Sequence, residues 1–160
     1  MKTIRVEEVY RIYGTATDSI PEDTSLEHII GRFAREPGLR GVFLVDSRQR
    51  FTGVITRADL MKWAHFQLFG GKGRHDMVIS DFYRIVDARK AKDLVSTDPQ
   101  GLVVKETDTL QTALDKMLDY EEDVLPVVDK ERRILGDLRL SEVLLKTIEM
   151  GKQVRESEQI

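Results

Sequence analysis

A threonine and an aspartate three residues apart, Thr56 and Asp59, are the two side chains of this 160-residue sequence best placed to bind a ligand. They lie where the apolar segment Phe51–Ile55 ends and a helical pattern begins. At such a junction a threonine hydroxyl and the free N–H groups of the first helical turn can face an anion. An aspartate on that turn can accept hydrogen bonds from both hydroxyls of a ribose, and apolar strand ends nearby can sandwich a base. The same spacing is also that of a capping box, in which both side chains satisfy N–H groups at the helix start. The two interpretations do not exclude each other.

The composition excludes several other kinds of chemistry. Cysteine is absent, so the chain has no disulfide, no thiolate metal site and no cysteine nucleophile. The three histidines, His28, His65 and His75, show no ligand spacing, and we expect them to be solvated or packed and not to bind metal. The sequence contains no serine nucleophile elbow and no Walker-type phosphate loop. These absences leave no recognisable nucleophile or metal cluster in the sequence.

The charge and hydropathy patterns bear on location and partners. With 25 basic and 28 acidic residues the net charge is -3, which offers no overall attraction to nucleic acid or to an anionic membrane. The nearest basic patch, from Arg84 to Lys92, is interleaved with aspartates. No apolar run approaches the roughly 18 residues that a membrane span needs, and the first residues do not form a signal peptide. The expected location is the cytoplasm.

The chain repeats itself with an offset of 83 or 84 residues. Segments 24–34 and 108–118 both place apolar residues at i, i+3, i+4, i+7 and i+8, which predicts two amphipathic helices. Matching capping-box signals precede them, Thr24 with Glu27 and Asp108 with Gln111. The apolar runs 42–46 and 125–129 predict buried strands, each followed by a charged turn, a second apolar segment with a glycine and a closing helix.

Further segments complete the two copies. The closing helices are expected from about Arg57 to Leu68 and from about Ser141 to Met150. Short extended pieces are expected near Thr17–Ile20 and Gly101–Val104, ahead of the first helix of each copy. We expect a flexible loop over 70–76, a helix over Ala88–Val95 in the connecting stretch, and a frayed polar tail after Gly151. The expected fold class is α+β: two β-α-β-β-α repeats, over residues 1–75 and 76–160. Each is too small to bury much core alone, so the two should pack about a pseudo-twofold axis.

In this arrangement the sequence resembles a tandem pair of CBS domains, the family first named for cystathionine β-synthase. The motif that carries the resemblance is Gly53-Val54-Ile55-Thr56-Arg57-Ala58-Asp59, which fits the family pattern glycine, two apolar residues, threonine or serine, two variable residues and aspartate. It follows a Val-Asp strand and a charged turn, as in the family. The resemblance extends from roughly Val6 to Met150 and includes both copies.

The resemblance implies a regulatory module that performs no chemistry of its own, so we expect a protein that is not an enzyme and requires no cofactor. Such pairs bind AMP, ADP, ATP, S-adenosylmethionine or related adenosyl compounds in clefts between the two repeats, and they commonly form homodimers. The regulated partner protein is not identified by the sequence. For the first copy the resemblance places Thr17, Asp18, Ile20 and Val42 near the ligand, beside Thr56 and Asp59.

The second copy departs from the family pattern. Arg139 stands where threonine or serine is expected, and Glu142 stands where aspartate is expected. Arg139 can grip a phosphate, fill the pocket or pair with Glu142, while Asp137 adds negative charge near a phosphate. The resemblance places Leu102, Val104 and Leu125 beside this second site.

The first closing helix also carries a signal for association. Trp63 with Met61, Phe66 and Phe69 makes it apolar on more than one face, which is typical of a dimer interface. A ligand-free dimerisation or protein-interaction module is therefore the alternative function. An enzyme acting on a nucleotide and a nucleic-acid-binding protein are two further alternatives, which the missing catalytic groups and the net charge disfavour.

Overall fold

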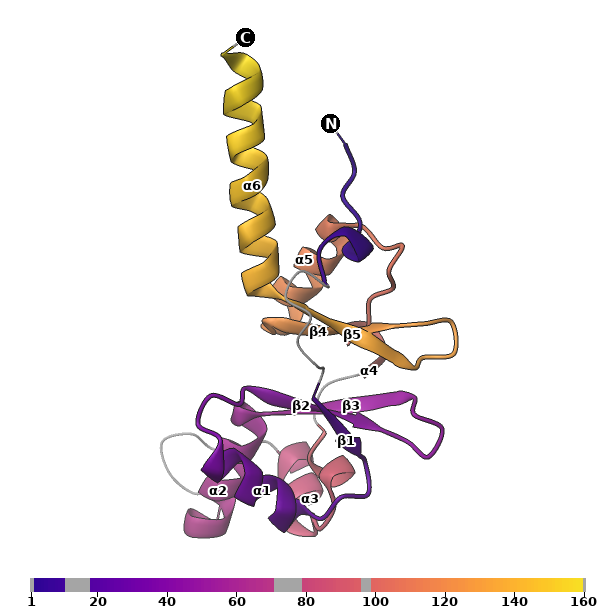
Figure 1. The fold of residues 1–160 in the computed structure, drawn as a ribbon. Coiled ribbons are helices and arrows are strands. Elements are labelled where there is room, and N and C mark those ends of the chain that lie inside the picture. Colours follow the sequence, from indigo (N-terminus) through magenta and orange to yellow (C-terminus); the bar gives the residue numbers. More distant parts are fainter. Residues whose placement is uncertain (1, 11–17, 71–78, 96–98, 160) are drawn as a thin grey trace. The chain divides into compact units, whose positions relative to one another are not determined.

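The computed structural model describes residues 2–10, 18–70, 79–95 and 99–159, and the chain divides into two compact units. The first unit is Asp18–Pro99, and the second joins Met1–Thr17 to Gln100–Ile160. Figure 1 shows their elements. The repeat boundaries expected from the sequence, 1–75 and 76–160, remain a prediction, because the units group residues by contact and not by repetition.

The described strands of the first unit form one three-stranded sheet in the order β1-β2-β3. Strand β1 (Ser19–Pro21) runs parallel to β2 (Gly41–Val45), which runs antiparallel to β3 (Phe51–Thr56). The helices are α1 (Leu26–Arg35), α2 (Arg57–Phe69) and α3 (Ile79–Val86), followed by the 3-10 turn η2 (Ala91–Leu94). The three helices cover one face of the sheet (Figure 1). The core between them consists of Leu26, Ile29, Leu44, Ile55, Ile85, Ala91 and Leu94.

The second unit repeats this plan with a smaller sheet. Strands β4 (Val124–Val128) and β5 (Ile134–Arg139) are antiparallel. The helices are α4 (Pro99–Leu102), α5 (Leu110–Tyr120) and α6 (Leu140–Glu158), and the 3-10 turn η1 (Val6–Glu8) lies in the same unit. Its buried side chains include Val6, Val9, Leu102, Val104, Leu110, Ala113, Leu125, Val127 and Leu138. The α+β class expected from the sequence is confirmed, and so is the order strand, helix, strand, strand, helix in the first repeat.

The extended piece expected near Gly101–Val104 is in large part replaced by α4, and an isolated bridge remains at Val104. In the first repeat the Phe43 N–H donates to the Asp18 carbonyl at 3.1 Å, which extends the parallel pairing. The residue equivalent to Phe43 is Pro126, which has no N–H to donate. The corresponding bond cannot form, and the second repeat lacks the beginning of this strand.

The helix expected over Ala88–Val95 is wrong. The structure has α3 before this segment and the short turn η2 within it. The Asp93 carboxylate accepts hydrogen bonds from the N–H groups of Arg89 at 2.9 Å and Lys90 at 3.0 Å. Such side-chain bonds to the backbone compete with helical ones and favour a turn.

The frayed tail expected after Gly151 is also wrong, because α6 continues to Glu158. The residues after Gly151 contain no proline or further glycine, and most have good helix propensity. A polar sequence is compatible with an exposed helix, so polarity alone did not justify the expectation. The loop expected over 70–76 begins at Gly70, which ends α2 with a left-handed φ of 64°. The rest of that loop lies outside the described residues.

Helices α1 and α5 are capped one residue later than the capping-box signals predicted. Ser25 accepts a hydrogen bond from the N–H three residues on at 3.3 Å, and Thr109 does the same at 3.1 Å. The side chains of Thr24 and Asp108 instead bond to backbone groups three residues before them, at 2.7 and 2.9 Å. They close the turn that precedes each helix.

The turn η2 satisfies backbone groups at the start of α1. The Leu26 N–H donates to the Arg89 carbonyl at 2.9 Å, and the Ala91 N–H donates to the Thr24 carbonyl at 2.8 Å. A helix leaves its first N–H groups without partners inside the helix, so an outside carbonyl at this point fixes where α1 begins. In the sequence η2 lies in the second repeat, although it binds the first helix of the first repeat.

The turn η1 makes the equivalent contacts with the other copy. The Leu110 N–H donates to the Ile4 carbonyl at 2.8 Å, and the Val6 N–H donates to the Asp108 carbonyl at 2.9 Å. In the sequence η1 lies at the beginning of the first repeat, yet it binds the start of α5 in the second. Each repeat therefore begins its first helix on a turn that leads into the other repeat, and we call this the turn exchange.

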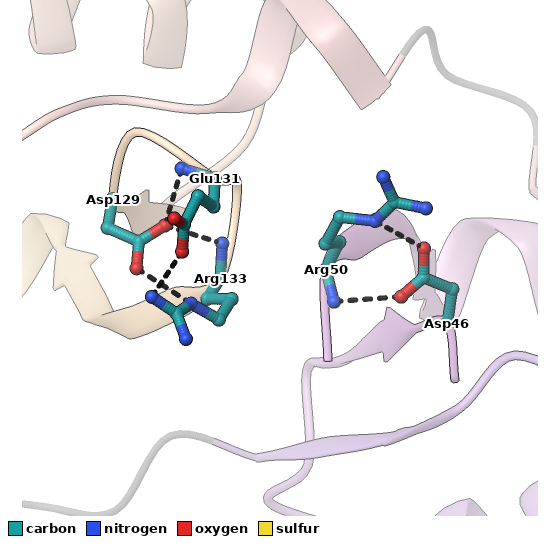
Figure 2. Close-up of polar contacts among 5 residues, drawn as sticks. All are labelled: Asp46, Arg50, Asp129, Glu131 and Arg133. Carbon is teal, nitrogen blue, oxygen red and sulfur yellow. Dashed lines mark hydrogen bonds and ion pairs between the residues drawn. The ribbon is translucent and has the colours of Figure 1, made fainter. Parts of the chain in front are cut away.

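The two hairpins are held by the same carboxylate arrangement, shown in Figure 2. Asp46 accepts hydrogen bonds from the backbone N–H groups of Arg48 at 2.9 Å and Arg50 at 3.0 Å, and from Arg50 Nε at 2.8 Å. Asp129 accepts the equivalent backbone bonds two and four residues on, at 2.8 and 2.9 Å, and one from Arg133 Nε at 3.0 Å. These turns fix a register that pairs Gly41 with Thr56 and Val124 with Arg139, and so they position the end of β3 and of β5.

The same bonds shift the acidity of both carboxyls. The backbone hydrogen bond from Arg50 is the largest influence on Asp46, whose pKa lies below its ordinary value of 3.8. For Asp129 desolvation raises the pKa, but the hydrogen bonds from Arg133 and Glu131 together outweigh it, and the pKa is again lowered. Carboxyls with a lowered folded-state pKa stabilise the fold when they are ionised.

The turn exchange predicts that η1 protects the first amide of α5, and not that of α1, from hydrogen exchange with solvent. Val6 is fully buried, so Val6→Asp should displace η1 by placing a charge in the core. We expect hydrogen exchange at the Leu110 amide to become roughly tenfold faster or more, with exchange at the Leu26 amide unchanged. Mass spectrometry of peptides from each helix measures this, with the exposed Glu7→Ala as control. If hydrogen exchange accelerated equally in both helices, the turn exchange would be contradicted.

The hairpin carboxylates predict a loss of stability in acid with a defined sign. Their stabilising contribution is present above the unfolded pKa near 3.8 and is lost as the pH falls through the lower folded values. Asp46→Asn and Asp129→Asn should therefore be less stable than the wild type in urea at pH 7. The difference should shrink toward zero below about pH 3, while the exposed Asp119→Asn in α5 changes little. A deficit that is equal at both pH values would show that the carboxylate charge is not the cause.

Candidate functional site

Thr56 and Asp59 lie together at the junction of β3 and α2. The Thr56 N–H donates to Asp59 Oδ2 at 2.8 Å, and the Thr56 hydroxyl donates to the same oxygen at 3.0 Å. The Asp59 N–H donates back to Thr56 Oγ1 at 3.4 Å. The capping-box interpretation of the spacing is thus confirmed. Asp59 is only 4% exposed, so its carboxylate is held in a fixed orientation within a nearly dry setting.

The sheet brings two of the other predicted contacts of the first copy near Thr56. Val42 lies on β2 next to Gly41, the pairing partner of Thr56, and the Asp18 carbonyl accepts a hydrogen bond from the residue after Val42. Ile20 lies farther along β1 and packs against the core. The side chain of Val42 is fully buried, so it contributes to the core of the unit as well. Thr17 lies outside the described residues.

The Asp18 carboxylate is already engaged by a cation. Arg32 on α1 contacts Asp18 Oδ2 through Nη2 at 2.5 Å, and this hydrogen bond raises the pKa of the Arg32 guanidinium. Both side chains are partly exposed. Arg32 was not singled out from the sequence. Arg32 is the seventh residue of α1, and its side chain reaches Asp18, the residue before β1. The opposite charges of these two residues, 14 positions apart on either side of the start of α1, are the signal in the sequence.

In the second repeat, Glu142 takes over the backbone bond of the missing aspartate. It accepts a hydrogen bond from the Arg139 N–H at 3.0 Å and is nearly buried. The Arg139 guanidinium does not occupy the position of the threonine hydroxyl on this carboxylate. It forms an ion pair with Asp137 instead, Nε to Oδ1 at 3.2 Å and Nη2 to Oδ2 at 3.3 Å. The sequence analysis expected Arg139 to bind a phosphate, fill the pocket or pair with Glu142. The structure shows an ion pair, but with Asp137.

The apolar residues predicted for the second site all lie in the core. Leu102, Val104 and Leu125 are at most 1% exposed. Val104 also uses both of its backbone groups in the sheet, because its N–H donates to Pro126 at 3.0 Å and its carbonyl accepts from Val128 at 2.9 Å. Their role toward a ligand remains a prediction.

The other candidate groups are also placed by the structure. His28 is exposed on α1, and His65 packs its ring edge-on against Phe69 with centroids 5.5 Å apart. His75 lies outside the described residues. Within the described ranges no three acidic or histidine side chains gather as a metal site would require. No helix among the described residues has both the length and the apolar character needed to cross a membrane.

Comparison with protein families agrees with the repeat seen in the sequence and the structure. Residues 11–65 and 91–148 each match the family model of the CBS domain. The chain belongs to the CBS domain family. A comparison with curated protein sequences finds no match for this chain.

Solved structures of CBS domain proteins share the fold. A CBS domain-containing protein from Thermotoga maritima is 25% identical, with a TM-score of 0.69 over 91% of this chain and 95% of that one. A CBS domain protein from Pyrobaculum aerophilum, complexed with AMP, is 17% identical, with a TM-score of 0.60 over 87% and 89% of the two chains. The CBS domain pair of protein MJ0100, in complex with 5′-methylthioadenosine and S-adenosyl-L-methionine, is 14% identical, with a TM-score of 0.63 over 94% and 99%. The tandem CBS pair is therefore the fold of this protein.

The ion pair in the second CBS repeat predicts a coupled effect on stability. Arg139→Ala should lower the free energy of unfolding by about 1–3 kcal/mol, because it leaves a nearly buried carboxylate without its guanidinium partner. The double variant Asp137→Val/Arg139→Thr, which restores the residue types of the first repeat, should recover most of that loss. Urea denaturation of the wild type, Asp137→Val, Arg139→Thr and the double variant measures the coupling, with Arg139→Ala as a further single variant. Additive effects of the two substitutions would rule it out.

Proposed function

We propose that this CBS pair is a non-catalytic regulatory module that binds an adenosine-containing ligand at the Thr56–Asp59 site of the first repeat. The observation that carries the proposal is the position of these two side chains, which complete the family motif where β3 ends and α2 begins. Complexes of similarly folded CBS proteins with AMP, and with 5′-methylthioadenosine and S-adenosyl-L-methionine, support the ligand class.

The geometry gives each group a role in that binding. The Thr56 N–H holds Asp59 Oδ2, so the orientation of the carboxylate that would accept the ribose hydroxyls is set before a ligand arrives. The Thr56 hydroxyl, which now donates to Asp59, can turn toward a phosphate or another polar group of the ligand. Ile20 supplies apolar surface from β1 for the base, and Asp18 supplies a carboxylate that Arg32 holds in place. Val42 is fully buried and shapes the site through the packing of β2.

Regulation requires that the ligand favour one conformation of the protein over another. A ligand that binds at the start of α2 and prefers one packing of that helix shifts the equilibrium toward it. We propose that the shift is read by a partner protein and that the CBS pair works as a homodimer.

A ligand-free interaction module is the second candidate, and the surface of α2 favours it. Met61, Leu68 and Phe69 are 66%, 73% and 61% exposed, while Trp63 and Phe66 pack against the core of the first unit. The helix is therefore apolar on a face that the first unit does not cover. Exposed apolar clusters of this kind mark association surfaces.

Thermal unfolding with AMP, ATP and S-adenosylmethionine separates the two functions. A ligand at about 100 times its dissociation constant stabilises the fold by about 2.7 kcal/mol, which corresponds to a rise in Tm of roughly 5–10 °C. Asp59→Ala should abolish that rise. Ser25→Ala, which removes the cap of α1, is the matched control: it should lower the starting Tm similarly and keep the ligand shift. No shift with any ligand would favour the interaction module.

A further inference from the structure

The motif of the second repeat differs from that of the first at two coupled positions. Asp137 replaces Val54, and Arg139 replaces Thr56. Val54 and Asp137 are equally inaccessible, each 7% exposed. A carboxylate therefore stands at a strand position that is apolar in the other copy, and an ionised carboxylate at such a position needs a cation beside it.

Arg139 supplies that cation. Residues i and i+2 of a strand project to the same side, so the two side chains meet on one face of β5. The guanidinium grips both oxygens of Asp137, with N–O distances of 3.2 and 3.3 Å. The exposed fractions of the two side chains are 35% for Arg139 and 9% for Asp137. The Arg139 side chain is thus partly exposed to solvent, whereas the Asp137 carboxylate is nearly buried.

The backbone of this position is satisfied as well. The Arg139 N–H donates to Glu142, which lies in the first turn of α6. Both groups that a phosphate would seek here, the guanidinium and the N–H at the start of the helix, are therefore bonded to carboxylates of the same unit. Asp137 takes Nε and Nη2 of the guanidinium, so a phosphate that approached the remaining N–H groups would lie beside a nearly buried carboxylate of its own sign.

We propose that the Asp137–Arg139 ion pair closes the second CBS repeat to phosphate-bearing ligands, so that each chain binds one adenosine ligand. The location of that ligand in the first repeat rests on the proposed function. In this role Asp137 is a residue that determines specificity: it does not contact the ligand, and it acts by holding Arg139.

Isothermal titration with ATP tests the proposal through the number of sites per chain. The wild type should bind one ATP, and Asp59→Ala should bind none. Asp137→Asn keeps the size of the side chain but removes its charge, which releases Arg139, and it should bind two. The double variant Asp59→Ala/Asp137→Asn should bind one, through the second repeat. Asp137→Val, with the residue of the first repeat, serves as the second variant if the asparagine variant does not fold, and circular dichroism checks each fold.

The outcomes separate this proposal from the proposed function. Two ATP per wild-type chain, or a single site that Arg139→Ala removes and Asp59→Ala does not, would overturn the closure of the second repeat. Folded Asp137 variants that gain no site would overturn it too. A wild type that binds nothing would refute nucleotide binding in the first repeat, while a site gained in Asp137→Asn would still support the closure.

Discussion

Backbone hydrogen bonds between a short turn and the first residue of a helix determine where the rest of each repeat is built. Without the Arg89 and Ile4 carbonyls, the N–H groups of Leu26 and Leu110 would have no protein partner at the two helix starts. Once α1 is anchored on η2, its apolar residues cover the sheet, in which the hairpin turn at Asp46 fixes the register of β2 and β3. The register in turn places Thr56 at the end of β3.

Periodicity and repetition made much of this predictable. Two copies with the same apolar spacing identified the helices, the strands and the junction at Thr56. The errors arose from backbone groups that hydropathy does not describe. Pro126 removes one donor and with it part of a strand, and Asp93 diverts two N–H groups from a helix. The caps moved by one residue because Thr24 and Asp108 bond backward to the preceding turn.

The candidate site was predictable to the extent that its contacts are local. The spacing of Thr56 and Asp59 predicts a capping box, and the structure has one. Arg139 was paired with a phosphate or with Glu142, whereas its partner is Asp137. The alternation of a strand contains that answer, since side chains two residues apart share a face. The prediction considered Arg139 only as the motif position of a threonine or serine, and not as a strand residue whose side chain lies on the same face as that of Asp137.

The turn exchange has a consequence for the ancestry of the tandem chain. A single ancestral repeat would have carried its own leading turn without the one that its first helix binds. Two identical chains could satisfy both helices by trading turns, as in a domain-swapped dimer. Duplication and fusion of one short gene would then convert a trade between chains into a trade within one chain. Two copies joined in this way are free to diverge, and the repeats of this chain now differ at Asp137 and Arg139.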